Sequence, residues 1–505
     1  MTTTQAMQLK SYMTLPLAQT ESQKELWQKL RPVNIPAACD TYKRTMSGSS
    51  AIFADNDSCY VLAARIPLNE DGVHGRYIMA GLEKALYPWF LEPVSAEEVQ
   101  EARSFFTSKG AVRHFPVAAW ERVLENKGRM PLDIYALPGG QGFLVKDGKH
   151  TPIMSVEGPG ALVTHLEPNL EHLYAPIIHA TKARLFREAT GMQFAEFGYR
   201  SDQNINNHVP LMMALYVGAG FKLTSDDQAV LLYPQYFNDI GTVGHEFIMA
   251  YQREGISLEE AQKQAYEEFV AANERSALLP DVIDTVKSGL PAILELVKKY
   301  LHTDKVIMPR FDSGDVVQQC IIWKRMTLEA GIAETKMVVE DGYTPAKARE
   351  TKRAYAEAGF NSNDIIVGAG GYFQQGCSRD AASLVYKRSA TFVNGMWEPA
   401  MKFSDSPGKS SIPGRARVWE KGRTLIVAQA GEEIPRAQPL MQRVVTQGRI
   451  TYNEDLDEQK RRAERTWNKY ETIEYSPATE AIIAQRTAEK EAIALRMQKG
   501  EETLA

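Results

Sequence analysis

The stretch VIMPRFDSGDVVQQ, from Val306 to Gln319, changes character in its middle. Its first residues are mostly apolar and suit a buried strand. They lead directly into Arg310, Asp312 and Asp315, beside a glycine that favours a turn. A core strand that ends in charged residues and is followed by a helical segment is typical of a βα unit.

The same order of residues recurs along the middle of the chain. Short apolar runs ending in Gly, Asp or Ser precede helix-like segments in MQFAEFGYRSDQ (192–203), YVGAGFKLTSDD (216–227), KMVVEDGYTP (336–345) and NDIIVGAGGYF (363–373). Strands that alternate with helices predict a parallel sheet and an α/β fold. If the sheet closes into a barrel, the residues just past each strand share one rim, where such folds keep their active sites.

The composition limits the class of protein. The chain has 505 residues, of which 44% are hydrophobic, and a net charge of -5, so it lacks the basic excess of a nucleic-acid binder. Four cysteines without CxxC spacing, Cys39, Cys59, Cys320 and Cys377, indicate a reducing compartment and no zinc site. Because we find neither a signal peptide nor an apolar run of about 18 residues, we expect a cytoplasmic protein without membrane contact.

Three places in the sequence carry residues suited to chemistry, and each also has a structural interpretation. Arg310 and Asp312 could orient hydroxyls or metal-bound phosphates, although Asp312 could instead cap the following helix. Gly370 and Gly371 could cradle a phosphate at a helix N-terminus, or simply form a tight turn. His245, in GTVGHEF, could carry a proton or act as a nucleophile, or be a structural histidine.

Taken in order, these segments resemble the nicotinate and nicotinamide phosphoribosyltransferases, the type II phosphoribosyltransferases of NAD synthesis. The similarity runs from Asp40 to about Gly414. It rests on DTYKRTM (40–46), EFGYR (196–200), GHEF (244–247), RFDSGD (310–315), VYK (385–387) and MKFSDSPGKSSIPG (401–414). Several motifs in one order are more specific than any single motif, and they favour the functional interpretations given above.

The resemblance implies a domain arrangement. Residues 166–400 would form an irregular parallel α/β barrel that carries the transferase site. Residues 1–165 would form an N-terminal α+β domain, in agreement with their short apolar runs bounded by turns. The segment 401–505, first β-rich and then helical, would pack with that domain.

The resemblance also implies an activity: phosphoribosyl pyrophosphate and nicotinate would give nicotinate mononucleotide, with ATP as co-substrate and Mg²⁺ as cofactor. His245 matches the histidine that ATP phosphorylates, and Arg310 and Asp312 complete the implied catalytic set. The implied substrate-binding residues are Tyr42, Phe197, Arg200, Ser225, Asp341, Gly370 and Gly371. The implied phosphate- or nucleotide-binding residues are Arg65, Arg379, Lys387, Lys402 and Lys409. Tyr42 would come from a partner subunit, so we expect a homodimer with shared active sites.

The choice between acid and amide depends on FKLTSDD (221–227). The nicotinamide branch has an aspartate at the position of Ser225, where it would accept a hydrogen bond from the amide and repel a carboxylate. The sequence therefore favours nicotinate. Nicotinamide stays open as a substrate, because FGYR and GAGGYFQQGCSRD (368–380) resemble that branch. The sequence also leaves open a quinolinate-type or different phosphosugar-binding barrel, and a catalytically inactive ligand-binding relative.

Overall fold

The computed structural model describes residues 15–70, 74–108, 115–202, 204–404 and 408–498. The chain divides into two compact units. One comprises Met1–Thr181, Met213–Gly218 and Cys377–Ala505, and the other comprises Lys182–Met212 and Ala219–Gly376. We call them the sheet unit and the barrel unit, and each is described by itself. Among the described residues, no helix has the length and apolar composition needed to cross a membrane.

The barrel unit is built on seven parallel strands, in the order β10-β11-β12-β13-β7-β8-β9. Thr242, just past the last of these strands, forms a further parallel bridge with Ala277 of the first, so the sheet curls back on itself. The strands are β7 (Gln193–Glu196), β8 (Leu223–Thr224), β9 (Asn238–Asp239), β10 (Arg275–Leu278), β11 (Val306–Phe311), β12 (Met337–Val339) and β13 (Ile365–Ala369). The predicted parallel α/β architecture is confirmed.

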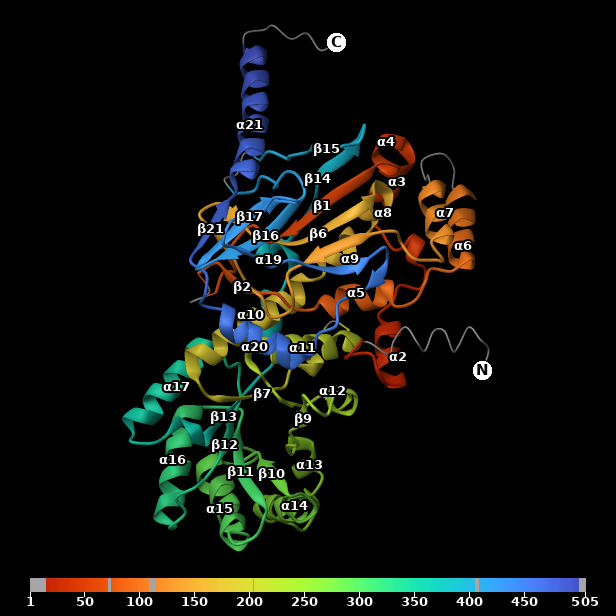
Figure 1. The fold of residues 1–505 in the computed structure, drawn as a ribbon. Coiled ribbons are helices and arrows are strands. Elements are labelled where there is room, and N and C mark those ends of the chain that lie inside the picture. The colour runs from red at the N-terminus through yellow and green to blue at the C-terminus, as the bar shows by residue number, and fades with distance from the viewer. Residues whose placement is uncertain (1–14, 71–73, 109–114, 203, 405–407, 499–505) are drawn as a thin grey trace. The chain divides into compact units, whose positions relative to one another are not determined.

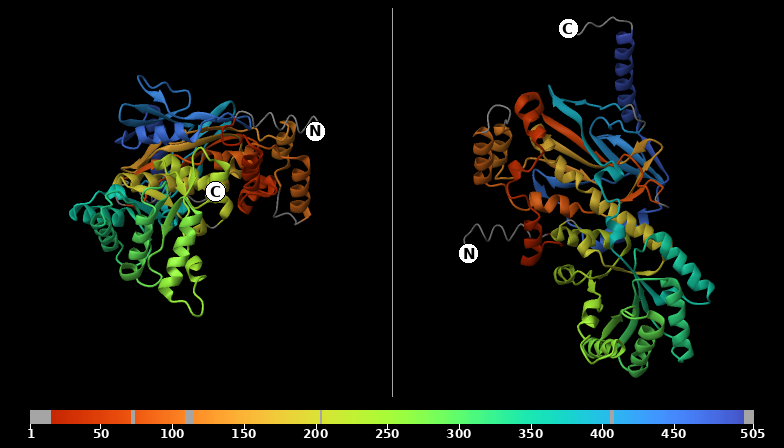
Figure 2. Two further views of the ribbon diagram at one scale, coloured as in Figure 1. Left: turned by 90° about the horizontal axis from the view of Figure 1, so that it is seen from below. Right: turned by 180° about the vertical axis from the view of Figure 1, so that it is seen from behind.

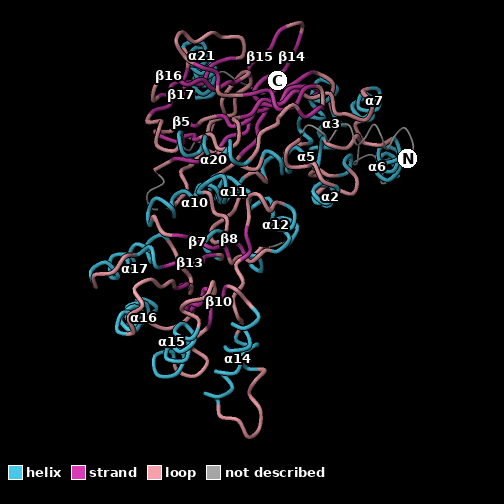
Figure 3. Tube along the Cα trace, turned by 60° about the horizontal axis from the view of Figure 1, so that its bottom comes forward, coloured by secondary structure: helices cyan, strands magenta, loops and turns pink. Residues whose placement is uncertain are grey.

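The inside of the curled sheet is apolar. Five strands each contribute one buried residue to a single cluster, namely Ala195, Ala277, Met308, Val338 and Ile366. Helices α14 (Leu258–Ala272), α15 (Leu290–Lys299), α16 (Val316–Glu329) and α17 (Pro345–Glu357) lie around the outside of the strands (Figures 1 and 3).

Each of three outer helices begins at a side-chain cap. Ser257 accepts the Glu260 N–H at the start of α14, and Thr344 accepts the Lys347 N–H at the start of α17. Helix α16 is capped by Asp315, whose carboxylate accepts the Gln318 N–H at 3.0 Å. Asp312 is therefore not the cap of this helix, and its carboxylate is left for other contacts.

The sheet unit joins segments from both ends of the chain. Its seven-stranded antiparallel sheet has the order β15-β14-β1-β6-β3-β19-β20, in which β1 pairs with β6 on one side and β14 on the other. The strands are β1 (Asp57–Ala63), β3 (Asp133–Ala136), β6 (Pro152–Pro159), β14 (Val385–Val393), β15 (Met396–Pro399), β19 (Gln442–Thr446) and β20 (Arg449–Ile450). The α+β part predicted from the N-terminal and C-terminal segments is thus present.

Two smaller sheets complete the strands of this unit. They have the orders β18-β16-β17-β21 and β2-β4-β5. Their strands are β2 (Arg76–Ile78), β4 (Gly142–Lys146), β5 (Lys149–His150), β16 (Ala416–Lys421), β17 (Thr424–Gln429), β18 (Gln438–Pro439) and β21 (Thr472–Tyr475). The last helix, α21 (Pro477–Gln498), extends away from these strands (Figures 1 and 2).

The compact units do not follow the predicted limits at residues 166 and 400. Strands β14 and β15 belong to the sheet unit because β14 pairs with β1. Helix α10 (Tyr174–Thr190) is continuous across the border at Thr181. Whether the predicted limits separate domains that fold on their own stays a prediction.

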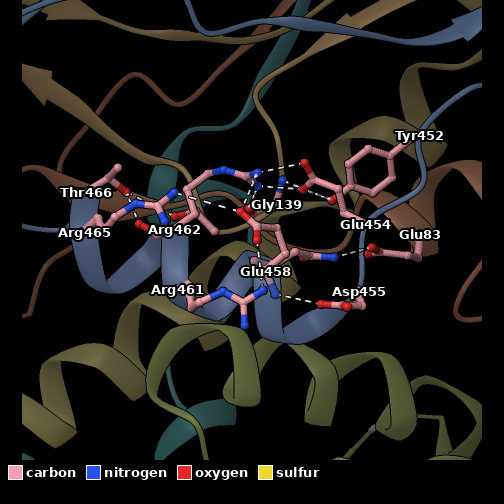
Figure 4. Close-up of polar contacts among 12 residues, drawn as sticks. Glu83, Gly139, Tyr452, Glu454, Asp455, Glu458, Arg461, Arg462, Arg465 and Thr466 are labelled. Carbon is pink, nitrogen blue, oxygen red and sulfur yellow. Dashed lines mark hydrogen bonds and ion pairs between the residues drawn. The ribbon is translucent and has the colours of Figure 1, made fainter.

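A buried carboxyl lies between two helices of the sheet unit, α5 (Leu82–Phe90) and α20 (Leu456–Thr466). Glu83 of α5 is 3% exposed, and its Oε1 accepts a hydrogen bond from Gln459 Nε2 of α20 at 2.6 Å. Close by, Arg462 binds both oxygens of Glu454, at 2.6 and 2.7 Å (Figure 4). Burial raises the pKa of Glu83 to about 7.

This pKa predicts how stability depends on pH. Because the folded state binds the Glu83 proton more tightly than the unfolded chain does, stability is lost as pH rises toward and through about 7. We expect Glu83→Gln to raise the free energy of unfolding at pH 8.5 by on the order of 2 kcal/mol and to change it little at pH 5. Thermal unfolding at the two pH values measures this difference.

A surface carboxylate provides the control. Glu471 pairs with Arg423 and is more than half exposed, so Glu471→Gln should alter stability by less than about 0.5 kcal/mol at both pH values. A loss of stability in Glu83→Gln that is equal at pH 5 and pH 8.5 would contradict the prediction.

Candidate active site at the carboxyl end of the barrel

The parallel strands of the barrel unit place their carboxyl ends on one rim. Residues that follow or end five of these strands lie on this rim. They are Phe197 and Arg200 after β7, Asp281 after β10, Arg310 and Asp312 at the end of β11, Glu340 and Asp341 after β12, and Gly370 and Gly371 after β13.

Three titratable residues meet on this rim. His245, the first residue of helix α13 (His245–Met249), has its Nε2 2.9 Å from Asp281 Oδ1. Ser313 Oγ donates to the other oxygen of Asp281 at 2.6 Å. One ligand atom from each of His245, Asp281 and Asp312 lies within 4.8 Å of the others. This cluster combines a histidine with oriented carboxylates, the groups that proton transfer, phosphoryl acceptance or a cation would need.

The two carboxyl groups of the cluster have different electrostatic environments. Although burial alone would raise it, the pKa of Asp281 is held below its ordinary value by hydrogen bonds from Ser313 and His245. Burial and then the negative charge of Asp281 raise the pKa of Asp312. Asp312 Oδ1 is buried and lacks a hydrogen-bond partner among the described residues. A ligand atom would therefore find an acceptor ready at Asp312.

Arg310 connects this cluster to the next strand end. Its Nη2 lies 3.9 Å from Asp312 Oδ2, its Nε lies 3.6 Å from Glu340 Oε1, and its Nη1 donates to Thr242 Oγ1. The contact with Glu340 is too long for a hydrogen bond. Burial raises the pKa of Glu340 despite the neighbouring cation. Arg310 thus has donor capacity left for an anion.

A cavity of about 260 Å³ opens beside Glu340. Its lining combines an aromatic ring, a guanidinium and a glycine-rich turn. The residues of interest are Phe197, Arg200, Glu340, Asp341, Gly370 and Gly371. The carboxylate of Asp341 is paired with Lys347 Nζ at 3.0 Å. The cavity suits a flat ring with an anionic substituent.

Two turns approach each other closely at this cavity. A Cβ added at Gly370 would lie 2.5 Å from Gly198 N and 2.6 Å from Gly198 Cα, whereas a Cβ at Gly371 would meet nothing within 4 Å. The Phe197 N–H also donates to the Ala369 carbonyl at 3.0 Å. The close backbone therefore requires glycine at position 370 but not at position 371.

This contrast gives a matched pair of variants. We expect Gly370→Ala to lower the free energy of unfolding by about 1–3 kcal/mol, because backbone atoms cannot move aside. Gly371→Ala should change it by less than about 1 kcal/mol. Chemical denaturation of both proteins measures the difference, and equal stability of the two variants would contradict the close approach of Gly198 and Gly370.

Ser225 lies apart from the lining of this cavity. It is exposed just past the end of β8, and its N–H donates to the Glu196 carbonyl at 3.0 Å. The next residue, Asp226, is 1% exposed, and its Oδ1 accepts the Gln228 N–H at the start of α12 (Asp227–Leu232).

The remaining predicted residues belong to the sheet unit. Tyr42 and Lys387 line a second cavity, of about 420 Å³, together with Lys43 and Glu167. Tyr42 is 49% exposed, and Lys387 Nζ lies 3.4 Å from Glu167 Oε1. Within this unit the ring of Tyr42 and the ammonium group of Lys387 therefore share one concave surface.

Arg65 contacts the loop that carries Lys409 and lies near Arg379. It donates to the Lys409 carbonyl at 2.9 Å and to Ser383 Oγ at 3.1 Å. Burial and then the positive charge of Arg379 lower the pKa of Arg65. Lys402 lies on the same loop as Lys409, where its N–H donates to Ser411 Oγ at 2.8 Å. Residues 405–407 of the motif on this loop lie outside the described residues.

Sequence reasoning did not identify Asp281, Ser313 or the buried residues Glu196 and His208. Asp281 had a signal: SALLPD (276–281) is another apolar run that ends in an acid. His208 had none, because nothing in its neighbourhood along the chain indicates which carboxylates it meets.

One family model and two curated relatives match parts of the chain. The model of the nicotinate phosphoribosyltransferase (NAPRTase) family matches residues 192–434. The chain is 26% identical to nicotinate phosphoribosyltransferase of Bacillus subtilis over 286 residues, 55% of this chain and 54% of that protein. The match thus spans about half the length of that relative. This chain is also 23% identical to nicotinamide phosphoribosyltransferase of Xanthomonas campestris over 388 residues, 68% of this chain and 80% of that protein.

Solved structures share the fold. The crystal structure of human nicotinic acid phosphoribosyltransferase superposes with a TM-score of 0.66 at 18% identity, covering 89% of this chain and 99% of that chain. A nicotinate-nucleotide pyrophosphorylase from Pyrococcus furiosus gives a TM-score of 0.58 at 16% identity, covering 85% and 95%.

Proposed function

We propose that this chain is a member of the nicotinate phosphoribosyltransferase family and transfers the phosphoribosyl group of phosphoribosyl pyrophosphate to nicotinate in NAD synthesis. The observation that carries the proposal is the shared rim of the barrel. There the His245, Asp281 and Asp312 cluster is joined through Arg310 to a cavity lined by Phe197.

The reaction is a displacement at the anomeric carbon of the sugar. The pyridine nitrogen attacks that carbon, the bond from the carbon to a pyrophosphate oxygen breaks, and pyrophosphate leaves with the bonding electrons. The ring nitrogen is already nucleophilic, so the protein mainly positions the reactants and neutralises charge. Guanidinium groups and glycine turns serve these needs, and no covalent nucleophile acts on the sugar.

The contacts of the rim suggest how the substrates are held. Phe197 would stack on the pyridine ring, and Arg200 would bind its carboxylate with a forked guanidinium. The turn at Gly370 and Gly371 would cradle the phosphate, because backbone N–H groups at the start of a helix suit an anion. Asp341 would contact the ribose hydroxyls.

The surroundings of Ser225 support nicotinate over nicotinamide. An amide-selective site needs an exposed carboxylate that accepts a hydrogen bond from the substrate NH₂. Ser225 has a hydroxyl at the sequence position where the nicotinamide branch has an aspartate, and the neighbouring Asp226 is buried as a helix cap. Nicotinamide is the second candidate because of the Xanthomonas campestris relative.

His245 would couple the transfer to ATP. Asp281 holds the Nε2 side of its ring, which leaves Nδ1 as the nitrogen with a lone pair for the phosphoryl group. In that step the bond between the γ-phosphorus and the bridging oxygen of ATP breaks, a P–N bond forms and ADP leaves. Hydrolysis of the phosphohistidine would drive base transfer forward.

A magnesium ion fits the residues of the cluster. Asp281 and Asp312 offer carboxylate oxygens, which Mg²⁺ prefers, and the buried Asp312 Oδ1 lacks a partner among the described residues. When bound, the ion would neutralise charge on the pyrophosphate. These residues are proposed ligands alongside the substrate phosphates.

The subunit arrangement and the location in the cell are proposals as well. A half-exposed Tyr42 on a concave surface of the sheet unit suits a ring that covers the base in a neighbouring subunit. Arg65, Arg379, Lys387, Lys402 and Lys409 would then neutralise pyrophosphate or nucleotide at the shared site. We propose a cytoplasmic homodimer.

Activity is tested with phosphoribosyl pyrophosphate, Mg²⁺ and either nicotinate or nicotinamide, with and without ATP. We expect nicotinate mononucleotide and pyrophosphate, formed at least tenfold faster with ATP. In His245→Ala the ATP effect and acid-labile phosphate on the protein should both disappear, while slow ATP-independent transfer continues. Chromatography of the nucleotide and ³²P labelling measure these results.

Each competing function predicts a different result. Faster turnover of nicotinamide than of nicotinate would make nicotinamide the preferred substrate. Product from quinolinate with release of CO₂ would favour the pyrophosphorylase class. Absence of pyrophosphate with every base would leave an inactive ligand-binding relative.

A further inference from the structure

His208 occupies the centre of a buried polar group beneath the rim of the barrel unit. It is the first residue of α11 (His208–Ala219) and is 3% exposed. Its Nδ1 lies 2.5 Å from Asp202 Oδ2, and its Nε2 lies 3.2 Å from Glu196 Oε2. Asp226 Oδ2 lies 3.9 Å from the same Nε2. Three carboxylates thus surround one imidazole ring.

This geometry requires the charged form of the ring. Both ring nitrogens face carboxylate oxygens, and only imidazolium has a proton to donate on each side. Burial alone would lower the pKa of His208, but hydrogen bonds and charge from Asp202 and Glu196 raise it to about 10. The ring is therefore a fixed cation at neutral pH. The rings of Tyr199 and His208 pack edge to face, with 5.1 Å between their centroids.

Each of the three carboxylates adjoins an element proposed to bind the base. Glu196 precedes Phe197, and Asp202 follows Arg200 by two residues. Asp226 follows Ser225. The structure therefore brings carboxylates from two separate chain segments, residues 196–202 and residue 226, to one cation.

Hydrogen bonds extend this group to the backbone of the turn at the cavity. Glu196 Oε1 accepts the Gly198 N–H, and Glu196 Oε2 also accepts from Thr224 Oγ1 at 3.2 Å. Thr224 Oγ1 in turn accepts the Asp226 N–H at 3.0 Å. Gly198 lies against Gly370 across the cavity turn, so a shift of Glu196 would be transmitted to both turns.

We propose that His208 is a positioning residue for an anionic pyridine base: its cation fixes Glu196, Asp202 and Asp226 and offsets their charge beneath the pocket. The inference rests on the proposed function and deepens it by naming what makes the pocket tolerate a carboxylate. Three buried negative charges without this cation would repel nicotinate and leave the neutral nicotinamide largely unaffected.

The test compares His208→Gln with His165→Gln. His165 is also a buried histidine, but its Nε2 contacts the Ile35 carbonyl and it lies in the sheet unit. We expect His208→Gln to raise the KM or Kd for nicotinate at least tenfold and those for nicotinamide and phosphoribosyl pyrophosphate less than threefold. His165→Gln should leave all three within threefold. Equal losses for both bases in His208→Gln would overturn the proposal.

A second variant tests the charge without removing the histidine. Asparagine can replace Asp226 as the cap of α12. Asp226→Asn should raise the preference for nicotinate over nicotinamide, and it should restore part of the nicotinate affinity when combined with His208→Gln. An unchanged preference in Asp226→Asn would overturn the proposal even if His208→Gln fails to fold.

Readouts other than turnover separate this inference from the proposed function. If the wild-type protein turns over neither base, the proposed function fails. NMR titration of the His208 ring and hydrogen exchange of residues 196–200 and 223–227 still test the inference. We expect a ring protonated beyond pH 8.5, and exchange in both segments at least tenfold faster in His208→Gln. A ring that is neutral at pH 7.5, or unchanged exchange, would overturn it.

Discussion

Parallel pairing of the barrel strands is the constraint on which the site depends. In a parallel sheet every strand ends on the same side, so residues more than 170 positions apart, such as Phe197 and Gly370, reach one rim. The apolar cluster inside the curled sheet fixes the strands, and the strands fix the direction of the side chains that follow them. The loops carry the charged side chains of the candidate site, but their positions come from the sheet.

Charge is distributed over this rim in an ordered way. Arg310 stands between two acidic groups, Asp312 on one side and Glu340 on the other, and its contacts with both are loose. His208 lies beneath another part of the rim and has tight contacts. Arg310, with its long contacts, retains hydrogen-bonding capacity for a ligand. His208, with its short contacts, holds the carboxylates of Asp202 and Glu196 in place.

Much of the fold could be predicted from the sequence because it follows from local patterns. Apolar runs that end in Gly or Asp and precede helical segments predicted the strand that contains Arg310 and the strands that end just before Phe197 and Gly370. Other features depend on tertiary contacts. Asp315 rather than Asp312 caps α16, since the cap is decided by which carboxylate faces the helix N–H groups.

The same limit applies to His208 and to the C-terminal border of the barrel unit. The partners of His208 lie at the end of β7, in the loop after it and after β8, and their meeting depends on how the sheet places these strand ends. Strand β14 follows the barrel segments directly, but it pairs with β1, a partner more than 300 residues away in the chain. Local periodicity contains no information on such pairing.

The position of β1 between β6 and β14 also governs the order of events during synthesis. At about 5–20 residues per second, a ribosome that has made Asp57–Ala63 needs tens of seconds more before Val385–Val393 emerges. Throughout that time one edge of β1 has no neighbour, while residues 219–376 emerge and can complete the curled sheet of the other unit. The nascent chain therefore presents an open strand edge that a chaperone, or a second nascent chain, can occupy.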